Sequence, residues 1–225
     1  MLSYLLGDGS IQSYIIQLLL TLPIILIALS LHETAHGYAA YKLGDPTAHS
    51  LGRLTLNPAK HLDPIGFICM LLFGFGWAKP VPINTRYFKK PRRDMLITAV
   101  AGPLSNILLA FIFGLSMKLL MLSVGGIPLP IDPISNMKFF LYCFLYYGVR
   151  LNIVLAVFNL LPIPPLDGSR LITSFLPPKA AMWVIRNERI IYFVLLGALF
   201  IGVLDPVINL LSNGLTNLIF FIFKI

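Results

Sequence analysis

The hydrophobic residues of this chain are concentrated in four long runs, which are separated by shorter polar or irregular segments. The runs cover Ile11–Leu31, Leu96–Leu122, Phe139–Leu161 and Ile190–Leu211. Each run approaches or exceeds the ~20 residues that an α-helix needs to cross a lipid bilayer. The pattern predicts an all-α membrane protein, in which about four full spans form one helical bundle and residues 1–225 make a single integral-membrane domain.

Two other apolar stretches, Ile65–Trp77 and Leu215–Ile225, are well short of the length of a span. We expect them to be short re-entrant or interfacial segments of the bundle. Val81-Pro82-Ile83-Asn84 predicts a short extended segment whose proline suits an exposed edge. Non-helical backbone at membrane depth needs shielding by protein or by a water-filled cavity, so this region would line a cavity if it enters the membrane.

Charged residues are few and unevenly distributed. They make up 12% of the chain, against 57% hydrophobic residues, whereas soluble domains carry roughly 25% charged residues. Just over half of the 17 Lys and Arg lie in 42–93, a second group lies in 162–189, and none lies before Ile11 or in 123–137. This alternation predicts a multi-pass protein of the cell membrane, with the N-terminus outside and both basic segments in the cytoplasm. We therefore attribute the net charge of +8 to the basic cytoplasmic segments that set the topology and contact the lipid bilayer, and not to a nucleic-acid surface.

One group of ionisable residues interrupts the first apolar run. The segment His32-Glu33-Thr34-Ala35-His36 has the His-Glu-x-x-His pattern. Two histidines four residues apart lie on one face of a helix, where both imidazoles can bind a single Zn²⁺. Glu33 can then act as general base on a water at the metal. Ionisable residues inside a membrane span are candidates for a functional site, because their burial in lipid is costly.

A catalytic zinc site needs a third protein ligand and one position for water. Asp167 follows the third long run and the proline-rich Pro162-Ile163-Pro164-Pro165, which ends the helix and places the carboxylate on a rigid turn. The two histidines lie roughly 9–15 Å inward of Lys42, the first cytoplasmic charge after them. We therefore expect one Zn²⁺ per chain, bound by His32, His36 and Asp167 near the cytoplasmic face.

Several segments together resemble the site-2 protease family of intramembrane zinc metalloproteases, which is peptidase family M50, and the resemblance covers most of the chain. The matching segments are His32-Glu33-x-x-His36, Gly52–Pro58, His61–Gly66, Ala101-Gly102-Pro103 and Asn159–Gly168. The joint presence, in order, of the first and the last is highly specific. Too few residues separate Pro103 from Asn159 for a PDZ domain, so the chain resembles the compact prokaryotic branch of the family.

The resemblance implies a role for each residue at a matching position. It implies that His32, His36 and Asp167 bind the metal and that Glu33 is the general base. It also implies that Asn159 holds the substrate backbone or the oxyanion near the zinc, since an amide can both donate and accept hydrogen bonds. A helix cap or an interhelical hydrogen bond is the alternative role for this asparagine.

Four other polar residues are weaker candidates. His61 either supports the metal ligands or is an ordinary loop histidine. Asn106 is expected to bond between helices or to line the cavity, and Asn152 to bond between helices or to support the site. Arg150, in the middle of the third run, faces either the cavity or a counter-ion such as a lipid phosphate.

These residues predict a zinc metalloendopeptidase that hydrolyses peptide bonds within or next to transmembrane segments of other membrane proteins. The substrate helix must unwind locally, and pairing as an extended strand with Val81–Asn84 would hold the unwound form. A zinc transporter and a catalytically inactive protein that binds membrane helices are the alternatives. A transporter needs ligands in both halves of the membrane, but no histidine follows residue 94, and a pure binder has no use for Glu33. The sequence predicts no oligomeric state.

Overall fold

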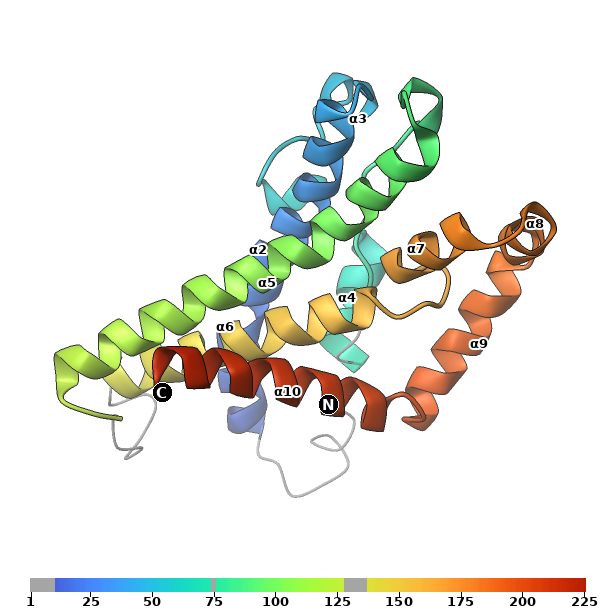
Figure 1. Cartoon of the computed structure of the whole chain (residues 1–225). Coiled ribbons are helices and arrows are strands. Elements are labelled where there is room, and N and C mark those ends of the chain that lie inside the picture. The colour runs from blue at the N-terminus through green and yellow to red at the C-terminus, as the bar shows by residue number, and fades with distance from the viewer. Residues whose placement is uncertain (1–10, 74–75, 128–136) are drawn as a thin grey trace.

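The long apolar segments form helices, which make up most of the molecule (Figure 1). The structure is a computed structural model that describes residues 11–73, 76–127 and 137–225. Within these residues, the helices long and apolar enough to cross a membrane are α2 (Ile11–Lys42), α5 (Pro91–Val124), α6 (Met137–Asn159) and α10 (Asp205–Phe223). The predicted all-α membrane bundle of about four spans is confirmed. The N-terminus and most of the loop at 123–137, both predicted on the outer side of the membrane, lie outside the described residues.

The remaining elements are short and belong to two connections. Between α2 and α5 lie α3 (Thr47–Ser50), α4 (Pro64–Phe73) and two 3₁₀ turns, η1 (Pro58–Lys60) and η2 (Thr85–Tyr87). Between α6 and α10 lie α7 (Asp167–Phe175), α8 (Pro178–Arg186) and α9 (Glu188–Ile201). The helix in the predicted re-entrant stretch, α4, has only 10 residues, about half of the length of a span.

Side chains from α2, α5, α6 and α10 share one apolar core. Its buried members are Ile24, Ala110, Phe113, Met117, Leu145, Val149, Ile153, Val157 and Ile219. α5 and α6 approach each other closely at Gly148, where an added Cβ would lie 2.5 Å from Cδ1 of Phe113. Small residues at such crossings increase van der Waals contact between helices, which holds membrane bundles together where lipid removes the hydrophobic effect.

Local sequence signals explain the ends of the first two long helices. α2 ends at Lys42, and Gly44 follows with a φ of +110°, a backbone conformation that glycine adopts without steric cost. α5 begins at Pro91, in the first turn, where the missing N–H of proline has no partner to lose. The helix continues through Pro103.

The fourth predicted span, Ile190–Leu211, is wrong in its boundaries. Gly202, with a φ of +77°, ends α9 inside that run, and α10 begins at Asp205-Pro206. α9 has only 14 residues, fewer than the ~20 of a span. α10 instead takes in most of Leu215–Ile225, which the sequence predicts to be a short re-entrant or interfacial segment. The apolar composition continues across the break, so hydrophobicity alone does not locate it.

The contact at Gly148 predicts a steric effect on stability. Gly148→Ala places a methyl group against the Phe113 ring and forces α5 and α6 apart, so we expect the free energy of unfolding to fall by about 1–3 kcal/mol. Gly197→Ala in α9 is the matched control, because a Cβ at Gly197 has no neighbour within 4 Å. Thermal unfolding of the purified protein in detergent measures both variants. Equal Tm values would contradict the close approach of the two helices.

Candidate metal centre

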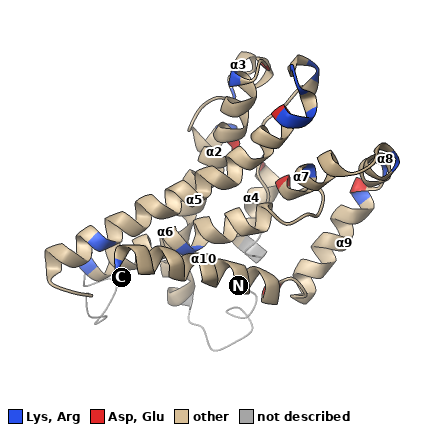
Figure 2. Ribbon diagram, in the orientation of Figure 1, with Lys and Arg blue, Asp and Glu red and all other residues tan. Residues whose placement is uncertain are grey.

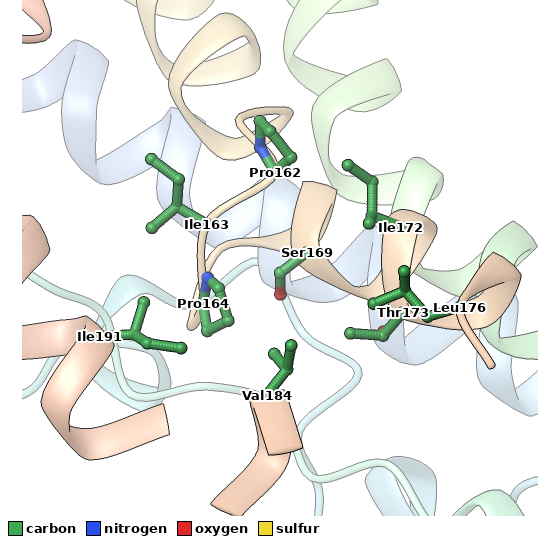
Figure 3. A pocket seen from close by; sticks show the side chains of 9 residues that line it. All are labelled: Pro162, Ile163, Pro164, Ser169, Ile172, Thr173, Leu176, Val184 and Ile191. Atoms are coloured by element: carbon green, nitrogen blue, oxygen red, sulfur yellow. The ribbon is translucent and has the colours of Figure 1, made fainter. Parts of the chain in front are cut away.

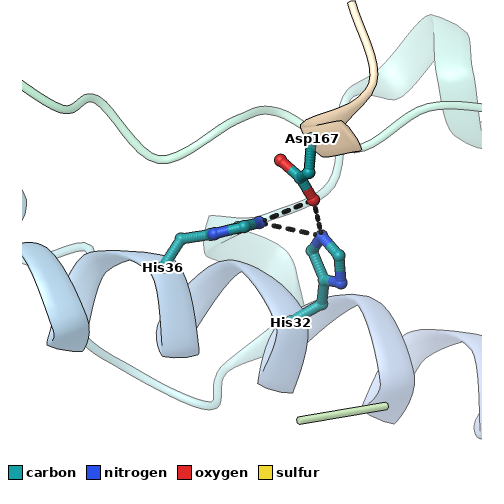
Figure 4. A group of neighbouring side chains, drawn as sticks. All are labelled: His32, His36 and Asp167. Atoms are coloured by element: carbon teal, nitrogen blue, oxygen red, sulfur yellow. Dashed lines mark hydrogen bonds and ion pairs between the residues drawn. The ribbon is translucent and has the colours of Figure 1, made fainter. Parts of the chain in front are cut away.

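Three side chains from two distant parts of the chain meet at one point. α2 presents His32 and His36 one turn apart, with their rings edge to face and their centroids 4.6 Å apart. Asp167 is the first residue of α7. Figure 4 shows its carboxylate pointing at the two imidazoles. The structure thus brings together the three residues that the sequence predicts as ligands.

The start of α7 is packed tightly against the end of α6. An added Cβ at Gly168 would lie 2.1 Å from the carbonyl oxygen of Leu160, so glycine is required by this close approach. Leu166 and Ser169 are buried, and Oγ of Ser169 donates to the Leu166 carbonyl at 2.7 Å. Because the residues around it are fixed in this way, Asp167 has little freedom to move.

The polar atoms of the cluster lie within hydrogen-bond distance of one another. Nε2 of His32 and Nε2 of His36 are 3.1 Å and 3.0 Å from Oδ2 of Asp167, and the two Nε2 atoms are 3.0 Å apart. The histidine side chains are 7% exposed and the carboxylate 15%. Burial by itself raises the pKa of the Asp167 carboxyl, but hydrogen bonds from the imidazoles and their charge when protonated outweigh burial and hold this pKa well below its usual range. The carboxyl group is therefore an anion.

The outer nitrogen of each imidazole indicates where its hydrogen lies. Nδ1 of His32 is 2.6 Å from Oδ1 of Asn106, and Nδ1 of His36 is 2.7 Å from the carbonyl oxygen of Thr98. Both partners are acceptors, so each Nδ1 carries the hydrogen and donates it. In a neutral imidazole this leaves Nε2 as an acceptor. Three acceptor atoms, the two Nε2 and Oδ2 of Asp167, then face one another with no hydrogen between them, and a cation relieves their repulsion.

This set of donor atoms fits zinc. Zn²⁺ binds imidazole nitrogen and carboxylate oxygen at ~2.0–2.2 Å in tetrahedral geometry, which separates neighbouring ligand atoms by about 3.3 Å. Within the described part of the chain, one group of potential ligands gathers in this way, His32, His36 and Asp167, with its ligand atoms within 4.8 Å of one another. Two imidazoles and one carboxylate leave the fourth position open for water, as in other catalytic zinc sites.

α5 packs against the two histidine rings and hydrogen-bonds to them. Gly102 packs directly on the rings, since an added Cβ would lie 2.3 Å from Nε2 of His36 and 2.7 Å from Cε1 of His32. Asn106 accepts from His32 and donates through Nδ2 to Oδ1 of Asn152 on α6 at 3.1 Å. Both asparagines are completely buried. Asn106 and Asn152 therefore bond between helices, and Asn106 also orients a histidine of the cluster.

Glu33 is held by a backbone amide. Its Oε2 accepts a hydrogen bond from the N–H of Val81 at 2.7 Å. At the other end of the same segment, the N–H of Asn84 donates to Oδ2 of Asp45 at 2.6 Å. Two backbone N–H groups of Val81–Asn84, the segment predicted as an exposed edge, are thus hydrogen-bonded within the protein. A backbone donor such as that of Val81, or a backbone acceptor such as that of Thr98, leaves no signal in the sequence.

Two predicted site residues make their hydrogen bonds away from the cluster. Nε2 of His61 is 2.7 Å from the carbonyl oxygen of Thr55, which also accepts from Oγ1 of Thr34 on α2 at 2.7 Å. Thr34 therefore joins the connection between α2 and α5 to α2, and His61 fixes the same carbonyl from within the connection. Asn159 is half-buried and donates to the Leu155 carbonyl of its own helix at 3.0 Å. Neither side chain is hydrogen-bonded to the cluster.

A cavity of about 240 Å³ lies among α7, α8, α9 and the turn that precedes α7 (Figure 3). Its lining is mostly apolar, with the hydroxyl groups of Ser169 and Thr173 as its polar side-chain atoms. Asp167 does not line it, and neither does any other predicted site residue. The cavity is therefore separate from the metal centre.

Apolar helices that enclose two imidazoles and a carboxylate define a membrane-embedded metalloprotein, and comparisons of the sequence narrow this class. A sequence model described as peptidase family M50 matches residues 123–202. A relative from Bacillus subtilis (strain 168), named "Putative zinc metalloprotease YwhC", is 43% identical over 204 residues, which cover 89% of this chain and 90% of the relative. The chain belongs to peptidase family M50 and is a zinc metalloprotease.

More distant relatives agree with this assignment. The Rip2 protein of Mycobacterium tuberculosis is 31% identical over 160 residues, which cover 68% of this chain and 56% of that protein. The Rip2 protein of Mycolicibacterium smegmatis is 30% identical over 174 residues, covering 74% of this chain and 61% of the relative. Both carry the same zinc metalloprotease description as the Bacillus protein. No solved structure matches the chain significantly.

The packing of Gly102 on the two rings predicts a loss of metal affinity on substitution. The methyl group of Gly102→Ala needs the space of the His36 ring and displaces both imidazoles, so we expect zinc affinity to fall about 10–100-fold. Gly114→Ala on the same helix is the control, because its Cβ would meet side chains of Ile219 and Phe223 instead. Zinc per chain is measured after dialysis against graded chelator. Wild-type zinc affinity in Gly102→Ala would contradict the close approach of α5.

Proposed function

We propose that the protein is an intramembrane zinc endopeptidase, a single integral-membrane domain over residues 1–225 that cleaves membrane proteins within or next to their transmembrane segments. The observation that carries this proposal is the meeting of His32, His36 and Asp167 in an apolar bundle, with Glu33 beside them on α2. Membership of a zinc metalloprotease family supports the hydrolysis. The membrane helices around the cluster support a substrate that itself lies in the membrane.

His32, His36 and Asp167 are the proposed ligands of one Zn²⁺. When bound, the zinc lowers the pKa of a coordinated water to around 7 and polarises the scissile carbonyl. The hydrogen bonds from Nδ1 of the two histidines to Asn106 and Thr98 keep both Nε2 atoms free of hydrogen and fix the ring orientations. Partners of this kind commonly set the tautomer and basicity of metal-binding histidines.

Glu33 is the proposed general base. A carboxylate beside the attacking water takes its proton as the new carbon–oxygen bond forms, and then delivers that proton to the nitrogen of the departing peptide. The N–H of Val81 holds Oε2 of Glu33 in one position and leaves Oε1 to accept the proton. A positioned general base of this kind contributes roughly 10²–10⁴-fold to the rate.

Asn159 is the proposed contact for the substrate backbone or the oxyanion. It is the last residue of α6, where the chain turns toward Asp167. The bond to the Leu155 carbonyl uses only one of the two N–H donors of the amide. The second N–H and the amide oxygen can therefore pair with an extended peptide. An oxyanion donor is typically worth ~3 kcal/mol in the transition state.

The charge distribution supports an orientation in the cell membrane. Figure 2 shows many of the Lys and Arg residues at the end of the molecule that holds α3, the start of α5 and α8. By the positive-inside rule this end faces the cytoplasm, which puts the N-terminus outside. The histidines lie roughly 9–15 Å inward of Lys42 along α2. We propose that water reaches them from the cytoplasmic side.

The proposed recognition step is pairing of the unwound substrate with Val81–Asn84 as an added strand. Pro82 has no N–H, and the amides at the two ends of this segment are already bonded to Glu33 and Asp45. The N–H of Ile83 has no acceptor among the described residues. It is therefore the donor that this segment can offer to a substrate carbonyl.

The role of Glu33 predicts a variant that keeps its metal and loses its activity. Glu33→Gln preserves the size of the side chain and an oxygen for the Val81 amide, but removes the base. We expect cleavage of a panel of model transmembrane substrates in vesicles to fall roughly 10²–10⁴-fold with unchanged zinc content, whereas Asp167→Asn loses zinc as well. Cleavage at the wild-type rate would refute the assignment, and zinc flux into the vesicles would favour a transporter.

The unpaired N–H of Ile83 predicts a variant of Val81–Asn84 that retains zinc but cleaves less well. Ile83→Pro removes that donor, whereas Ile83→Ala trims the side chain and keeps it. Loss of one hydrogen bond of about 1 kcal/mol should lower kcat/KM on the same substrates about fivefold for the proline variant, with zinc retained in both. If the two variants cleave equally well, strand pairing at this position does not occur.

A further inference from the structure

Arg150 is a cation in the middle of a membrane-spanning helix, and the metal centre does not use it. It lies nine residues before the end of α6 at Asn159, which is roughly 14 Å along the helix axis. This distance is longer than an arginine side chain, so the guanidinium cannot reach the end of the span. Ionisable residues at such depth are costly and are candidates for a functional site, with a partner to be identified.

The partner within the chain is neutral. NH1 of Arg150 donates to Oδ1 of Asn213 on α10 at 2.5 Å. Among the described residues, the guanidinium has no other hydrogen-bond acceptor and no carboxylate with which it forms an ion pair. An arginine carries five N–H donors and a full charge, so one amide oxygen leaves most of its bonding capacity unused.

Asn213 belongs to a line of three asparagines along α10. Asn209, Asn213 and Asn217 are spaced four residues apart, so they lie on one face of the helix, each about 6 Å from the next. All three are exposed, and the amides of Asn209 and Asn217 have no hydrogen-bond partner in the described part of the chain. The adjacent face of α10, about a quarter of a turn around the helix, carries Ser212 and Thr216 and is buried against the bundle.

Lipid chains cannot supply the hydrogen bonds and the counter-charge that Arg150 and the three asparagines of α10 need. Hydrocarbon offers neither acceptors for a guanidinium nor partners for amides, whereas polar side chains hydrogen-bond strongly enough to hold membrane helices together. We propose that the face formed by Arg150, Asn209, Asn213 and Asn217 binds a membrane-spanning helix of another protein that carries an Asp or Glu at the depth of Arg150. We name it the Arg150 face.

Charge complementarity selects this partner over a second copy of the chain. A symmetric dimer through the Arg150 face would bring two guanidinium groups together in the membrane, and like charges at an interface are strongly unfavourable. A carboxylate neutralises the cation and accepts two of its N–H donors at once. Asn209 and Asn217 can then donate to and accept from polar groups one turn above and below that carboxylate.

The Arg150 face is distinct from the metal centre. α10 lies in front of α6 in Figure 1, whereas α2, which carries the histidines, passes behind it. A helix docked here would therefore contact the enzyme across α6 from the zinc ligands. The inference goes beyond the proposed peptidase function and does not depend on it.

The test uses the full chain reconstituted in phosphatidylcholine vesicles with a donor fluorophore at its C-terminus. The probes are acceptor-labelled single-span peptides of about 20 Leu and Ala residues with Glu, Gln or Leu at the centre. We expect the Glu peptide to bind about tenfold more tightly than the Leu peptide, as measured by energy transfer. The Gln peptide should lie between them, because an amide can pair with asparagines but does not neutralise Arg150.

Variants of the face separate charge from hydrogen bonding. Arg150→Leu should remove the advantage of the Glu peptide over the Gln peptide, and Arg150→Lys, which keeps the charge, should retain it. Asn217→Leu should weaken the binding of both the Glu peptide and the Gln peptide. Lys138→Leu removes a charge from the first turn of the same helix, and should leave binding unchanged.

Three results would overturn the proposal. The first is equal binding of the Glu and Leu peptides by the wild-type chain. The second is an Arg150→Leu variant that keeps the full preference for Glu. The third is energy transfer between two labelled copies that Asn217→Leu abolishes while no peptide binds, which would assign the face to self-association. Because the readout needs neither zinc nor cleavage, its failure is distinguishable from failure of the proposed function.

Discussion

Polar groups on a membrane helix must find their partners within protein, because hydrocarbon supplies neither hydrogen bonds nor counter-charge. The two histidines of α2 meet this requirement at the outer nitrogen of each ring. Their outer nitrogens donate to Asn106 and to the carbonyl of Thr98, which leaves the inner nitrogens as acceptors facing Asp167. The remaining repulsion among three acceptors is what makes the site specific for a cation, and the geometry of the surrounding helices serves to hold that arrangement.

α5 is the helix that makes this arrangement fit. Thr98, Gly102 and Asn106 are spaced four residues apart and lie on one face, opposite His32 and His36 on α2. The earlier histidine bonds to the later residue of α5 and the later histidine to the earlier one, as expected for antiparallel neighbours. Gly102 stands between them without a side chain, so the helices can approach until the rings touch the backbone. Two hydrogen-bond acceptors and one glycine of α5 thus determine both the orientation of the rings and the spacing of the helices.

The same physical constraint has a different outcome at Arg150. The metal cluster is enclosed by α2, α5 and α7. Among the described residues, by contrast, the Arg150 guanidinium is hydrogen-bonded to one amide alone and lies beside exposed asparagines. Glu33 is an intermediate case, since its carboxylate is fixed by the amide of Val81 but keeps one oxygen free. Polar groups with all of their hydrogen bonds made within the protein therefore serve to hold the site in position. Polar groups with unused hydrogen-bonding capacity are the ones available for chemistry or for a partner.

The sequence by itself determined the long helices α2, α5 and α6, because apolar length and proline or glycine punctuation are local properties. It also singled out His32, His36, Glu33 and Asp167 as candidate site residues, because ionisable residues in apolar surroundings stand out along the chain. It could not place the break at Gly202, since the apolar pattern continues through it. Only the tertiary structure decided that Thr98 and Val81 hold His36 and Glu33, and that Arg150 meets Asn213, because backbone partners and contacts between distant helices depend on packing and leave no local pattern.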